Sequence, residues 1–223
     1  MQQLLSYLKY FFYIALHFNP LLAIAMLYDD IRGERKYNIR TTGVKEVYKL
    51  KIKDIDTSNA AEYMPANYVL LEKVFTEVNK HPHNHTFLDM GCGKGRALFV
   101  AAHFGFQKIT GVELVPKYCQ QLQQQIAEKA AQFPNTSFFV HCGNAAQYAI
   151  PDEVQVIFFY NPFNEKVMRP VVQQIAKSLQ RAQRPLYVIY LNPLFKHLFI
   201  TVGFKEVYYT KRFGYLTASV MCK

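Results

Sequence analysis

The sequence predicts an α/β protein in which helices cover a mostly parallel sheet, and three observations support this fold class. From Thr86 onward, short apolar runs alternate with longer amphipathic ones, which is the pattern of strands and helices in a parallel sheet. A glycine-rich turn follows the first apolar run, and two β-rich runs separated by a glycine end the sequence. The 223 residues, 51% of them hydrophobic, suffice for one such domain and a modest N-terminal extension.

The chain is expected to divide into an extension, residues 1–60, and a domain, residues 61–223. In the first 28 residues, two apolar pieces at helical spacing are separated by His17-Phe18-Asn19-Pro20. Neither piece reaches the roughly 20 residues needed to span a bilayer. The first eight residues carry no basic side chain, which argues against a signal peptide. We favour a helix packed on the domain; the alternative is an amphipathic helix lying on a membrane surface.

A strongly basic segment follows these apolar pieces. The formal charge of the chain is +10. The range Ile31 to Lys53 contains eight Lys and Arg residues and only two acidic residues, Glu34 and Glu46. Such a surface favours nucleic acid, anionic lipid or an acidic protein as partner, although a solvated face that only aids solubility is an equal alternative. Residues 47–53 alternate apolar and basic side chains, which predicts an amphipathic strand.

The cysteines indicate neither a metal site nor a disulfide scaffold. Cys92, Cys119, Cys142 and Cys222 lie far apart, without a Cys-x-x-Cys pair or a histidine at metal-ligand spacing. We therefore expect no metal, and reduced thiols in a cytoplasmic protein, with a single disulfide left open. Peripheral membrane contact through residues 1–53 is the open alternative for localisation.

The elements of the domain are expected in the following order. A helix over Asn67–Asn79 precedes strands over Thr86–Met90, Lys108–Glu113, Ser137–Cys142, Gln155–Tyr160 and Pro185–Leu191; helices over Arg96–Phe104, Pro116–Gln132, Val167–Gln183 and Asn192–Val202 alternate with them; and hairpin strands over Phe204–Thr210 and Tyr215–Met221 close the chain. The strand over residues 155–160 is the most apolar, so we expect it to be central and buried on both faces.

The turn Asp89-Met90-Gly91-Cys92-Gly93-Lys94-Gly95 is the first candidate site. Glycines at such a turn let backbone N–H groups approach a ligand closely. The spacing is Gly-x-Gly-x-Gly, whereas the dinucleotide fingerprint is Gly-x-Gly-x-x-Gly. A pyrophosphate requires donors and positive charge, but Asp89 offers an acceptor that suits an ammonium group. The motif therefore favours an ammonium-bearing ligand, with a purely structural turn as the alternative.

Two later strand ends carry residues suited to a nucleoside. Glu113 ends the second strand, where a carboxylate can accept hydrogen bonds from both ribose hydroxyls. Asn144, in the turn after the third strand, could bond the edge of an adenine. A Glu at the end of a strand is often simply exposed to solvent, and Asn144 could belong to an ordinary turn. Both functional interpretations are therefore supported only by the spacing of these residues from the glycine-rich turn.

Tyr160-Asn161-Pro162-Phe163 follows the most apolar strand and is the candidate reaction centre. The side-chain oxygen of Asn161 and a neighbouring carbonyl could accept hydrogen bonds from an attacking amine, with an aromatic ring packed on it. Asn-Pro is also a common loop opener, and Asn192-Pro193 repeats the pair. We favour a functional role for Asn161 and a structural one for Asn192. The sequence offers no His or Glu that could be named as a general base.

These motifs together resemble a known family. Asp89-x-Gly91-x-Gly93-x-Gly95-Arg96, Gly111-Val112-Glu113 and Tyr160-Asn161-Pro162-Phe163 look like a family of largely uncharacterised bacterial class I S-adenosylmethionine-dependent methyltransferases, and Tyr28-Asp29-Asp30, Thr41-Thr42-Gly43 and Tyr63-Met64-Pro65 extend the resemblance upstream. The motifs are more distantly similar to non-SET histone lysine methyltransferases and mitochondrial lysine methyltransferases. The resemblance implies a Rossmann-like, seven-stranded sheet whose last strand is antiparallel.

The resemblance also implies a cofactor and a set of site residues. S-adenosyl-L-methionine would be bound by Asp89, Gly91, Cys92, Gly93, Gly95, Arg96, Glu113, Leu114, Asn144 and Ala145, with Thr42 and Tyr63 closing over it; Tyr160, Asn161, Pro162 and Phe163 would serve methyl transfer. The acceptor is expected to be a nitrogen, with a protein lysine favoured and nucleic acid or a small molecule open. A nucleotide-binding Rossmann oxidoreductase and a non-catalytic binding module are the alternatives from other classes.

Overall fold

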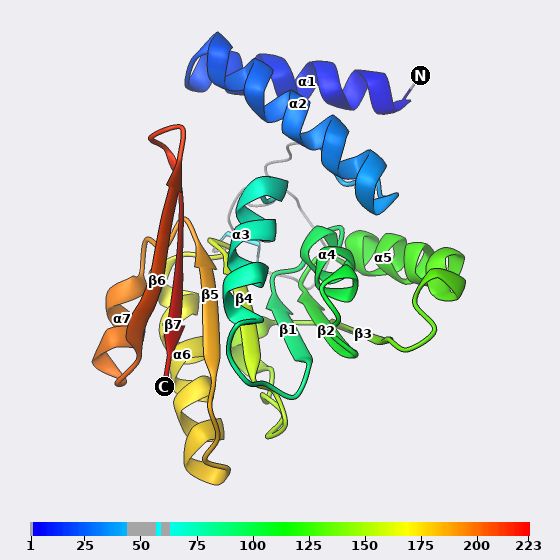
Figure 1. Cartoon of the computed structure of the whole chain (residues 1–223). Coiled ribbons are helices and arrows are strands. Elements are labelled where there is room, and N and C mark those ends of the chain that lie inside the picture. The colour runs from blue at the N-terminus through cyan, green and yellow to red at the C-terminus, as the bar shows by residue number, and fades with distance from the viewer. Residues whose placement is uncertain (1, 44–56, 59–62) are drawn as a thin grey trace.

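A seven-stranded sheet forms the centre of the protein. The computed structural model describes residues 2–43, 57–58 and 63–223, and its strands lie in the order β3-β2-β1-β4-β5-β7-β6 (Figure 1). They are β1 (Thr86–Met90), β2 (Lys108–Glu113), β3 (Ser137–Cys142), β4 (Val156–Tyr160), β5 (Tyr187–Leu191), β6 (Lys205–Arg212) and β7 (Leu216–Cys222). Strands β1 to β5 pair in parallel, and β7 is antiparallel to β5 and β6. The predicted α/β sheet with its C-terminal antiparallel hairpin is confirmed.

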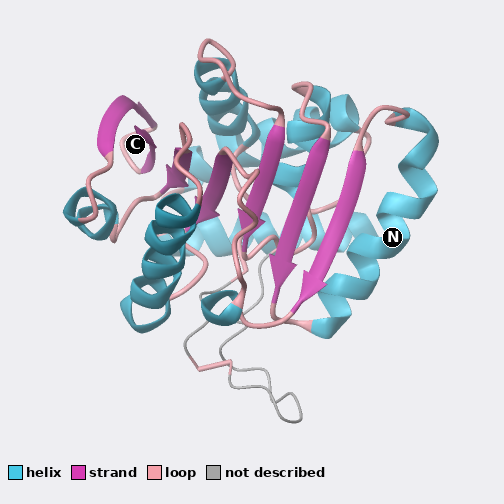
Figure 2. Cartoon of the chain, turned by 90° about the horizontal axis from the view of Figure 1, so that it is seen from below, coloured by secondary structure: helices cyan, strands magenta, loops and turns pink. Residues whose placement is uncertain are grey.

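Helices cover both faces of this sheet (Figure 2). The helices of the domain are α3 (Tyr68–Val78), α4 (Arg96–His103), α5 (Pro116–Lys129), α6 (Glu165–Arg181) and α7 (Lys196–Thr201). Successive side chains of β4 point to opposite faces: Val156 and Phe158 join the core under α3 and α4, and Ile157 and Phe159 join the core under α6 and α7. Strand β4 lies between β1 and β5 and is buried on both faces, as its apolar sequence predicts.

Most element boundaries follow the sequence, and the deviations have local causes. The first three strands begin and end as predicted. Helix α6 begins before Val167, because the Asn164 side chain accepts a hydrogen bond from the Val167 N–H and caps the helix there. Helix α7 begins only at Lys196, because Asn192 has a φ of 49°, which a helix does not allow. The predicted strand over residues 47–53 and the boundary at residue 60 lie outside the described residues.

The first two helices, α1 (Gln2–His17) and α2 (Pro20–Tyr37), form a hairpin that lies beside the β6–β7 connection (Figure 1). The Asn19 side chain accepts a hydrogen bond of 2.7 Å from the Leu22 N–H and so caps α2. The two helices share a small core of Tyr10, Ile14, Leu22, Ala23 and Met26, with Met64 and Leu216 of the domain packed against it. The favoured expectation of a helix packed on the domain is confirmed. Among the described residues, no helix is long and apolar enough to cross a membrane.

Arg96, the first residue of α4, joins α2 to the domain through a buried polar network. Its guanidinium donates hydrogen bonds to Asp30 Oδ1 (2.7 Å), Thr41 Oγ1 (2.7 Å) and Thr42 Oγ1 (3.0 Å). Glu34 Oε1 accepts from the backbone N–H groups of Thr41 and Thr42, each at 2.6 Å. Burial raises the pKa of Asp30, and Arg96 opposes this shift. The network fixes residues 41–42 against the start of α4.

Asp29 ties α2 to two further elements. Its carboxylate oxygens accept hydrogen bonds of 2.9 and 2.7 Å from Arg212 Nη2, and Oδ2 also accepts one of 2.9 Å from Asn67 Nδ2. Arg212 ends β6, and Asn67 caps α3. The acidic pair of α2 therefore holds this helix on the domain. Asp30 is bonded to Arg96, and Asp29 is bonded to Arg212 and Asn67.

Replacement of Arg96 by methionine should lower the free energy of unfolding by about 3–5 kcal/mol, because Asp30 and Glu34 would stay buried without their cation. Urea denaturation measures this loss. Arg169→Met is the matched control: its ion pair with Glu165 is exposed, so a loss below about 1 kcal/mol is expected. Equal losses in the two variants would contradict the role given to the buried network.

Candidate functional site

A cavity of about 600 Å³ opens at the carboxyl ends of β1, β2, β3 and β4. Its position is the point where the strand order reverses between β1 and β4, the usual ligand site of an open α/β sheet. The volume lies within the range of small-molecule sites. The lining residues are Tyr63–Ala66, Asp89, Gly91–Gly93, Arg96, Ala97, Val112–Leu114, Pro116, Tyr118, Cys142–Ala145, Gln147, Phe158, Tyr160, Pro162, Phe163 and Val167.

The glycine-rich turn forms the floor of this cavity. Gly91 N and Cys92 N both donate hydrogen bonds to Val112 O, at 2.9 and 3.0 Å, which ties the turn to β2. Gly93 has a φ of 54°, and a Cβ there would lie 2.6 Å from the Tyr63 ring. A Cβ on Gly91 would likewise collide with Pro162. Both positions therefore require glycine, because two cavity walls pack directly against the backbone.

Asp89 is a buried carboxylate that faces the cavity without a counter-ion. It is the penultimate residue of β1 and 2% exposed, and it forms no ion pair within the described part of the chain. Burial raises the pKa of Asp89 well above its ordinary value, and the neighbouring Glu113 raises it further. A cationic group in the cavity would stabilise the ionised form of this side chain.

Glu113 braces the turn from the end of β2. Its Oε2 accepts a hydrogen bond of 2.7 Å from Gly93 N, and its Oε1 accepts one of 2.8 Å from Val115 N. Burial raises the pKa of Glu113, whereas these backbone hydrogen bonds act in the opposite direction. A carboxylate has about four lone-pair positions, so this one can still accept hydrogen bonds from two hydroxyl groups of a ligand.

Asn144 lines the cavity beyond β3, but part of its side chain is already engaged. Its Oδ1 accepts a hydrogen bond of 2.9 Å from Ala146 N and caps the short 3₁₀ helix Ala145–Gln147. The side-chain NH₂ group is what remains to pair with a ligand. The structure thus places Asn144 where a base edge was expected, with a donor rather than an acceptor to offer.

The expectation of four reduced cysteines is wrong for two of them. Cys119 of α5 and Cys142 at the end of β3 are joined by a disulfide, with their Cα atoms 5.9 Å apart. Helix α5 packs on β3, which brings together two residues that are 23 positions apart in the chain. Cys92 and Cys222 are free. Among residues 2–43, 57–58 and 63–223, no three His, Cys, Asp or Glu side chains gather as metal ligands.

The segment after β4 forms the wall opposite Glu113. Tyr160, Pro162 and Phe163 line the cavity, whereas Asn161 is not among the lining residues. Asn161 has a φ of 40°, and its Oδ1 is buried without a hydrogen-bond partner among the described residues. Burial raises the pKa of Tyr160 to about 12, so its hydroxyl is neutral and donates to Met64 Sδ at 3.6 Å.

Residues 63–66 close the cavity from above. The Tyr63 hydroxyl donates a hydrogen bond of 2.6 Å to Thr41 O, and its ring packs on that of Tyr118 with centroids 5.3 Å apart. Thr42 does not line the cavity; it belongs to the network around Arg96. Arg96 itself lines the cavity and positions the cap in two ways: it donates a hydrogen bond of 2.8 Å to Ala66 O, and it bonds to Thr41, whose carbonyl oxygen accepts from Tyr63.

The structure therefore brings most of the predicted residues together. The predicted residues that line the cavity are Tyr63, Asp89, Gly91, Cys92, Gly93, Arg96, Glu113, Leu114, Asn144, Ala145, Tyr160, Pro162 and Phe163; those that do not are Thr42, Gly95 and Asn161. Gly95 is instead the N-cap residue of α4, and a Cβ there would collide with Leu122. Sequence reasoning missed Met64 and Tyr118 as lining residues. Met64 lies inside the motif Tyr63-Met64-Pro65, which was a usable signal, whereas Tyr118 has no distinguishing pattern.

Comparison with known proteins agrees with this architecture. Residues 87–185 match the family model described as "Methyltransferase domain". The crystal structure of a SAM-dependent methyltransferase from Aquifex aeolicus is similar, with 14% identity, a TM-score of 0.52, and 68% of this chain and 88% of that chain covered. The chain has the class I methyltransferase fold. A search of curated protein sequences finds no match.

Two further structures share this class I methyltransferase fold. The glycopeptide N-methyltransferase MtfA in complex with (S)-adenosyl-L-methionine is 11% identical, with a TM-score of 0.54 and coverage of 68% of this chain and 86% of that chain. The PH0226 protein from Pyrococcus horikoshii OT3 is 15% identical, with a TM-score of 0.51 and the same two coverages of 68% and 86%. At these identities the similarity establishes the fold alone.

Proposed function

We propose that the protein is an S-adenosyl-L-methionine-dependent methyltransferase that acts on a nitrogen atom. The observation that carries this proposal is Asp89, a buried carboxylate that faces the cavity and has no counter-ion within the part of the chain that the structure describes. A buried charge is costly unless it is paired. The ammonium group of S-adenosyl-L-methionine would supply the missing partner, and the sulfonium would add a second positive charge nearby.

The rest of the cavity fits the same cofactor. Glu113 retains acceptor positions for the two ribose hydroxyls, and the NH₂ group of Asn144 can donate to a ring nitrogen of adenine. Glycines 91 and 93 let the backbone approach the amino acid moiety. A nicotinamide dinucleotide fits poorly, because its pyrophosphate would face the two buried carboxylates Asp89 and Glu113.

S-adenosyl-L-methionine supplies an electrophilic methyl group, so the protein has chiefly to position the acceptor in line with the breaking bond and to exclude water. Tyr63 and Met64 cover the cavity, and Tyr160 and Phe163 present aromatic faces on the acceptor side. Asn161 does not itself line the cavity, but it lies between Tyr160 and Pro162, which do, and its Oδ1 is a buried acceptor without a donor among the described residues; we propose that it accepts an N–H of the incoming amine where the acceptor enters beside these two residues. The proton released by the amine would pass to solvent, since the neutral Tyr160 cannot take it.

A protein lysine is our preferred acceptor. Its narrow aliphatic chain can pass between Tyr160 and the Tyr63 cap. Its terminal amine can donate a hydrogen bond to Asn161 Oδ1, which has no partner among the described residues. This choice also follows the resemblance to lysine methyltransferases. A nucleic acid base or a small amine remains the alternative, and the basic residues of α2 provide a reason to test nucleic acid.

Replacement of Asp89 by asparagine should weaken S-adenosyl-L-methionine binding by about 10- to 100-fold, because an ionic hydrogen bond is lost. Only the ionised carboxylate attracts the ammonium group, and the pKa of Asp89 is raised. Wild-type affinity should therefore fall on acidification at a higher pH than for an ordinary carboxyl group, and Asp89→Asn should show a shallower fall. Calorimetry across pH measures both effects. Asp152→Asn, at an exposed site, is the control; matching affinities in both variants would refute the role of Asp89.

Replacement of Asn161 by alanine should lower methyl transfer by about 100-fold, because a group that orients the acceptor is removed. Cofactor affinity should stay within about threefold of the wild type, since Asn161 does not line the cavity. Asn192→Ala is the matched control: it also precedes a proline and has a positive φ, so the two substitutions cause the same backbone strain.

The assay for Asn161→Ala follows labelled methyl transfer from S-adenosyl-L-methionine into a lysate that is then fractionated into protein, nucleic acid, lipid and metabolites. We expect label in protein, at lysine, for the wild type and Asn192→Ala. Undiminished labelling by Asn161→Ala would discard the role of that residue. Label in nucleic acid or metabolites would refute the lysine acceptor while leaving methyl transfer itself in place.

A further inference from the structure

The outer face of the α1–α2 hairpin is apolar and exposed. On α1, the side chains of Leu4, Leu8, Phe12 and Leu16 recur every four residues and all face solvent, with Leu16 81% exposed. On α2, Leu21, Ile24 and Tyr28 continue the same surface, with Leu21 80% exposed. Single exposed apolar residues are ordinary, but a continuous stripe on two adjacent helices marks a surface that is covered by something else.

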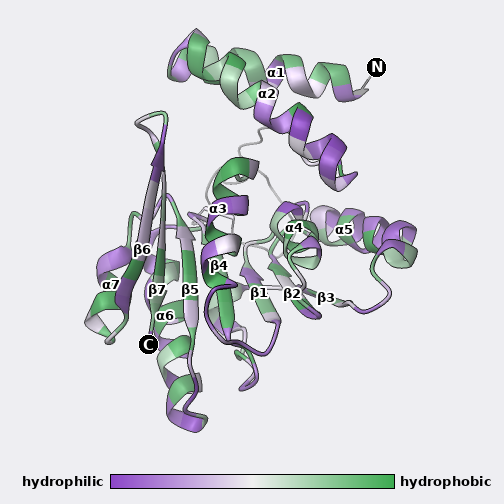
Figure 3. Cartoon of the chain, in the orientation of Figure 1, coloured by the Kyte–Doolittle hydropathy of each residue, from purple (hydrophilic) through white to green (hydrophobic). Residues whose placement is uncertain are grey.

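This surface extends onto the β6–β7 connection. The Phe18 ring, at the end of α1, meets the Tyr215 ring with centroids 6.0 Å apart. Tyr215 and its neighbour Phe213 are themselves exposed at the tip of the hairpin. Figure 1 shows that the tip and the α1–α2 turn lie together at one end of the molecule, and Figure 3 shows that α1 and the first half of α2 are hydrophobic. Aromatic side chains at a boundary between apolar and aqueous surroundings are typical of membrane interfaces.

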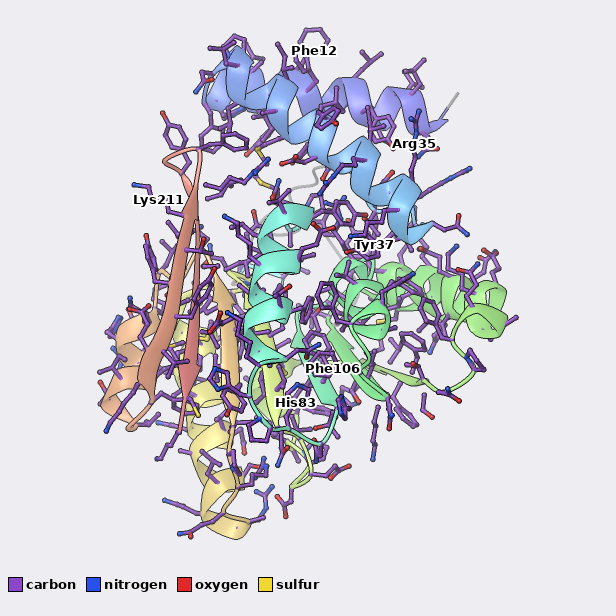
Figure 4. The ribbon with its side chains drawn as sticks, viewed as in Figure 1. Phe12, Arg35, Tyr37, His83, Phe106 and Lys211 are labelled. Carbon is purple, nitrogen blue, oxygen red and sulfur yellow. A yellow bond between two sulfur atoms is a disulfide. The ribbon has the colours of Figure 1, made fainter. Side chains whose placement is uncertain are left out.

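The exposed charged side chains that residues 2–43 contribute to this surface are positive. The three carboxylates of residues 2–43, those of Asp29, Asp30 and Glu34, are buried in the contacts with the domain. The exposed charged residues of the same segment are Lys9, Arg32, Arg35, Lys36 and Arg40. In Figure 4, Phe12 points away from the domain, Arg35 lies on α2, and Lys211 lies on β6 near its connection to β7. Arg32 and Lys36 pair with Glu72 of α3, and Lys9, Arg35 and Arg40 add further exposed cations, so the border of the apolar stripe is mainly positive and matches an anionic lipid surface.

The position of Lys9 favours a bilayer over a second copy of the chain as the partner of this surface. It lies on the exposed stripe of α1, four residues after Leu5 and three before Phe12. In a symmetric dimer through this face, its ammonium group would lose water, and the described residues of the face offer it no carboxylate in return. At a membrane, a lysine chain reaches up to the phosphates while its methylene groups stay in the apolar layer.

We propose that the α1–α2 hairpin and the tip of the β6–β7 connection dock the protein on the surface of an anionic lipid bilayer, with the apolar stripe inserted among the acyl chains. This docking is independent of the proposed methyl transfer. The described helices lie in the interface rather than across it, since none of them can span a bilayer.

Vesicle co-sedimentation of the full chain tests the proposal. The wild type should sediment with vesicles of phosphatidylcholine containing about 30% phosphatidylglycerol, should bind pure phosphatidylcholine far more weakly, and should be released by about 0.5 M salt. Phe12→Asp combined with Leu16→Asp should reduce binding to the anionic vesicles by at least about tenfold. Phe139→Asp combined with Ile200→Asp is the matched control at similarly exposed apolar sites away from the surface, and it should bind as the wild type does.

Circular dichroism and thermal unfolding establish that both double variants fold, because all four substituted side chains are exposed. Failure of the wild type to bind anionic vesicles would overturn the proposal, and so would full binding by the Phe12→Asp, Leu16→Asp variant. A wild-type dimer in sedimentation that this variant converts to a monomer, without vesicle binding, would assign the surface to a second copy of the chain. Vesicle binding and methyl transfer are measured separately, so either result stands without the other.

Discussion

Two buried carboxylates without a counter-ion among the described residues are the constraint on which this account depends. Asp89 and Glu113 lie at the carboxyl ends of neighbouring parallel strands, and burial raises the pKa of each. Glu113 accepts backbone hydrogen bonds from the turn, but folding alone gives no reason to keep Asp89 beside it in a low-dielectric cavity. A ligand that carries an ammonium group and vicinal hydroxyls resolves this cost, and the glycine-rich turn lets such a ligand come close to both side chains.

The buried acidic residues of α2 show how the same protein treats carboxylates that are purely structural. Asp30 and Glu34 meet Arg96, and Asp29 meets Arg212, so each structural carboxylate receives a cation from the domain. The described residues provide Asp89 with none. This difference within one molecule separates residues that hold the fold from residues that hold a ligand. It also explains how α2 matters to the cavity: Glu34 and Arg96 fix Thr41, and Thr41 O fixes the hydroxyl of Tyr63 above Gly93.

The sequence predicted what depends on local pattern. The apolar runs located β1 to β4 closely, and the glycine spacing with Asp89 and Glu113 located the cavity, because the carboxyl ends of parallel strands meet at one edge. The sequence did not predict contacts between segments that are distant in the chain. The disulfide of Cys119 and Cys142 depends on how α5 packs on β3, and the burial of Asp30 depends on an arginine 66 positions away. Thr42 was expected to close over the cofactor, but it does not line the cavity. The sequence showed its motif and could not show that its hydroxyl is bonded to Arg96, which is distant in the chain.

A crystal structure with S-adenosyl-L-homocysteine tests the central claim most directly, because this demethylated product of the cofactor keeps the amino acid, ribose and adenine groups. The account predicts its ammonium group within about 3 Å of the Asp89 carboxylate and its ribose hydroxyls on Glu113. An empty cavity at saturating ligand, or a ligand whose ammonium group lies away from Asp89, would contradict it.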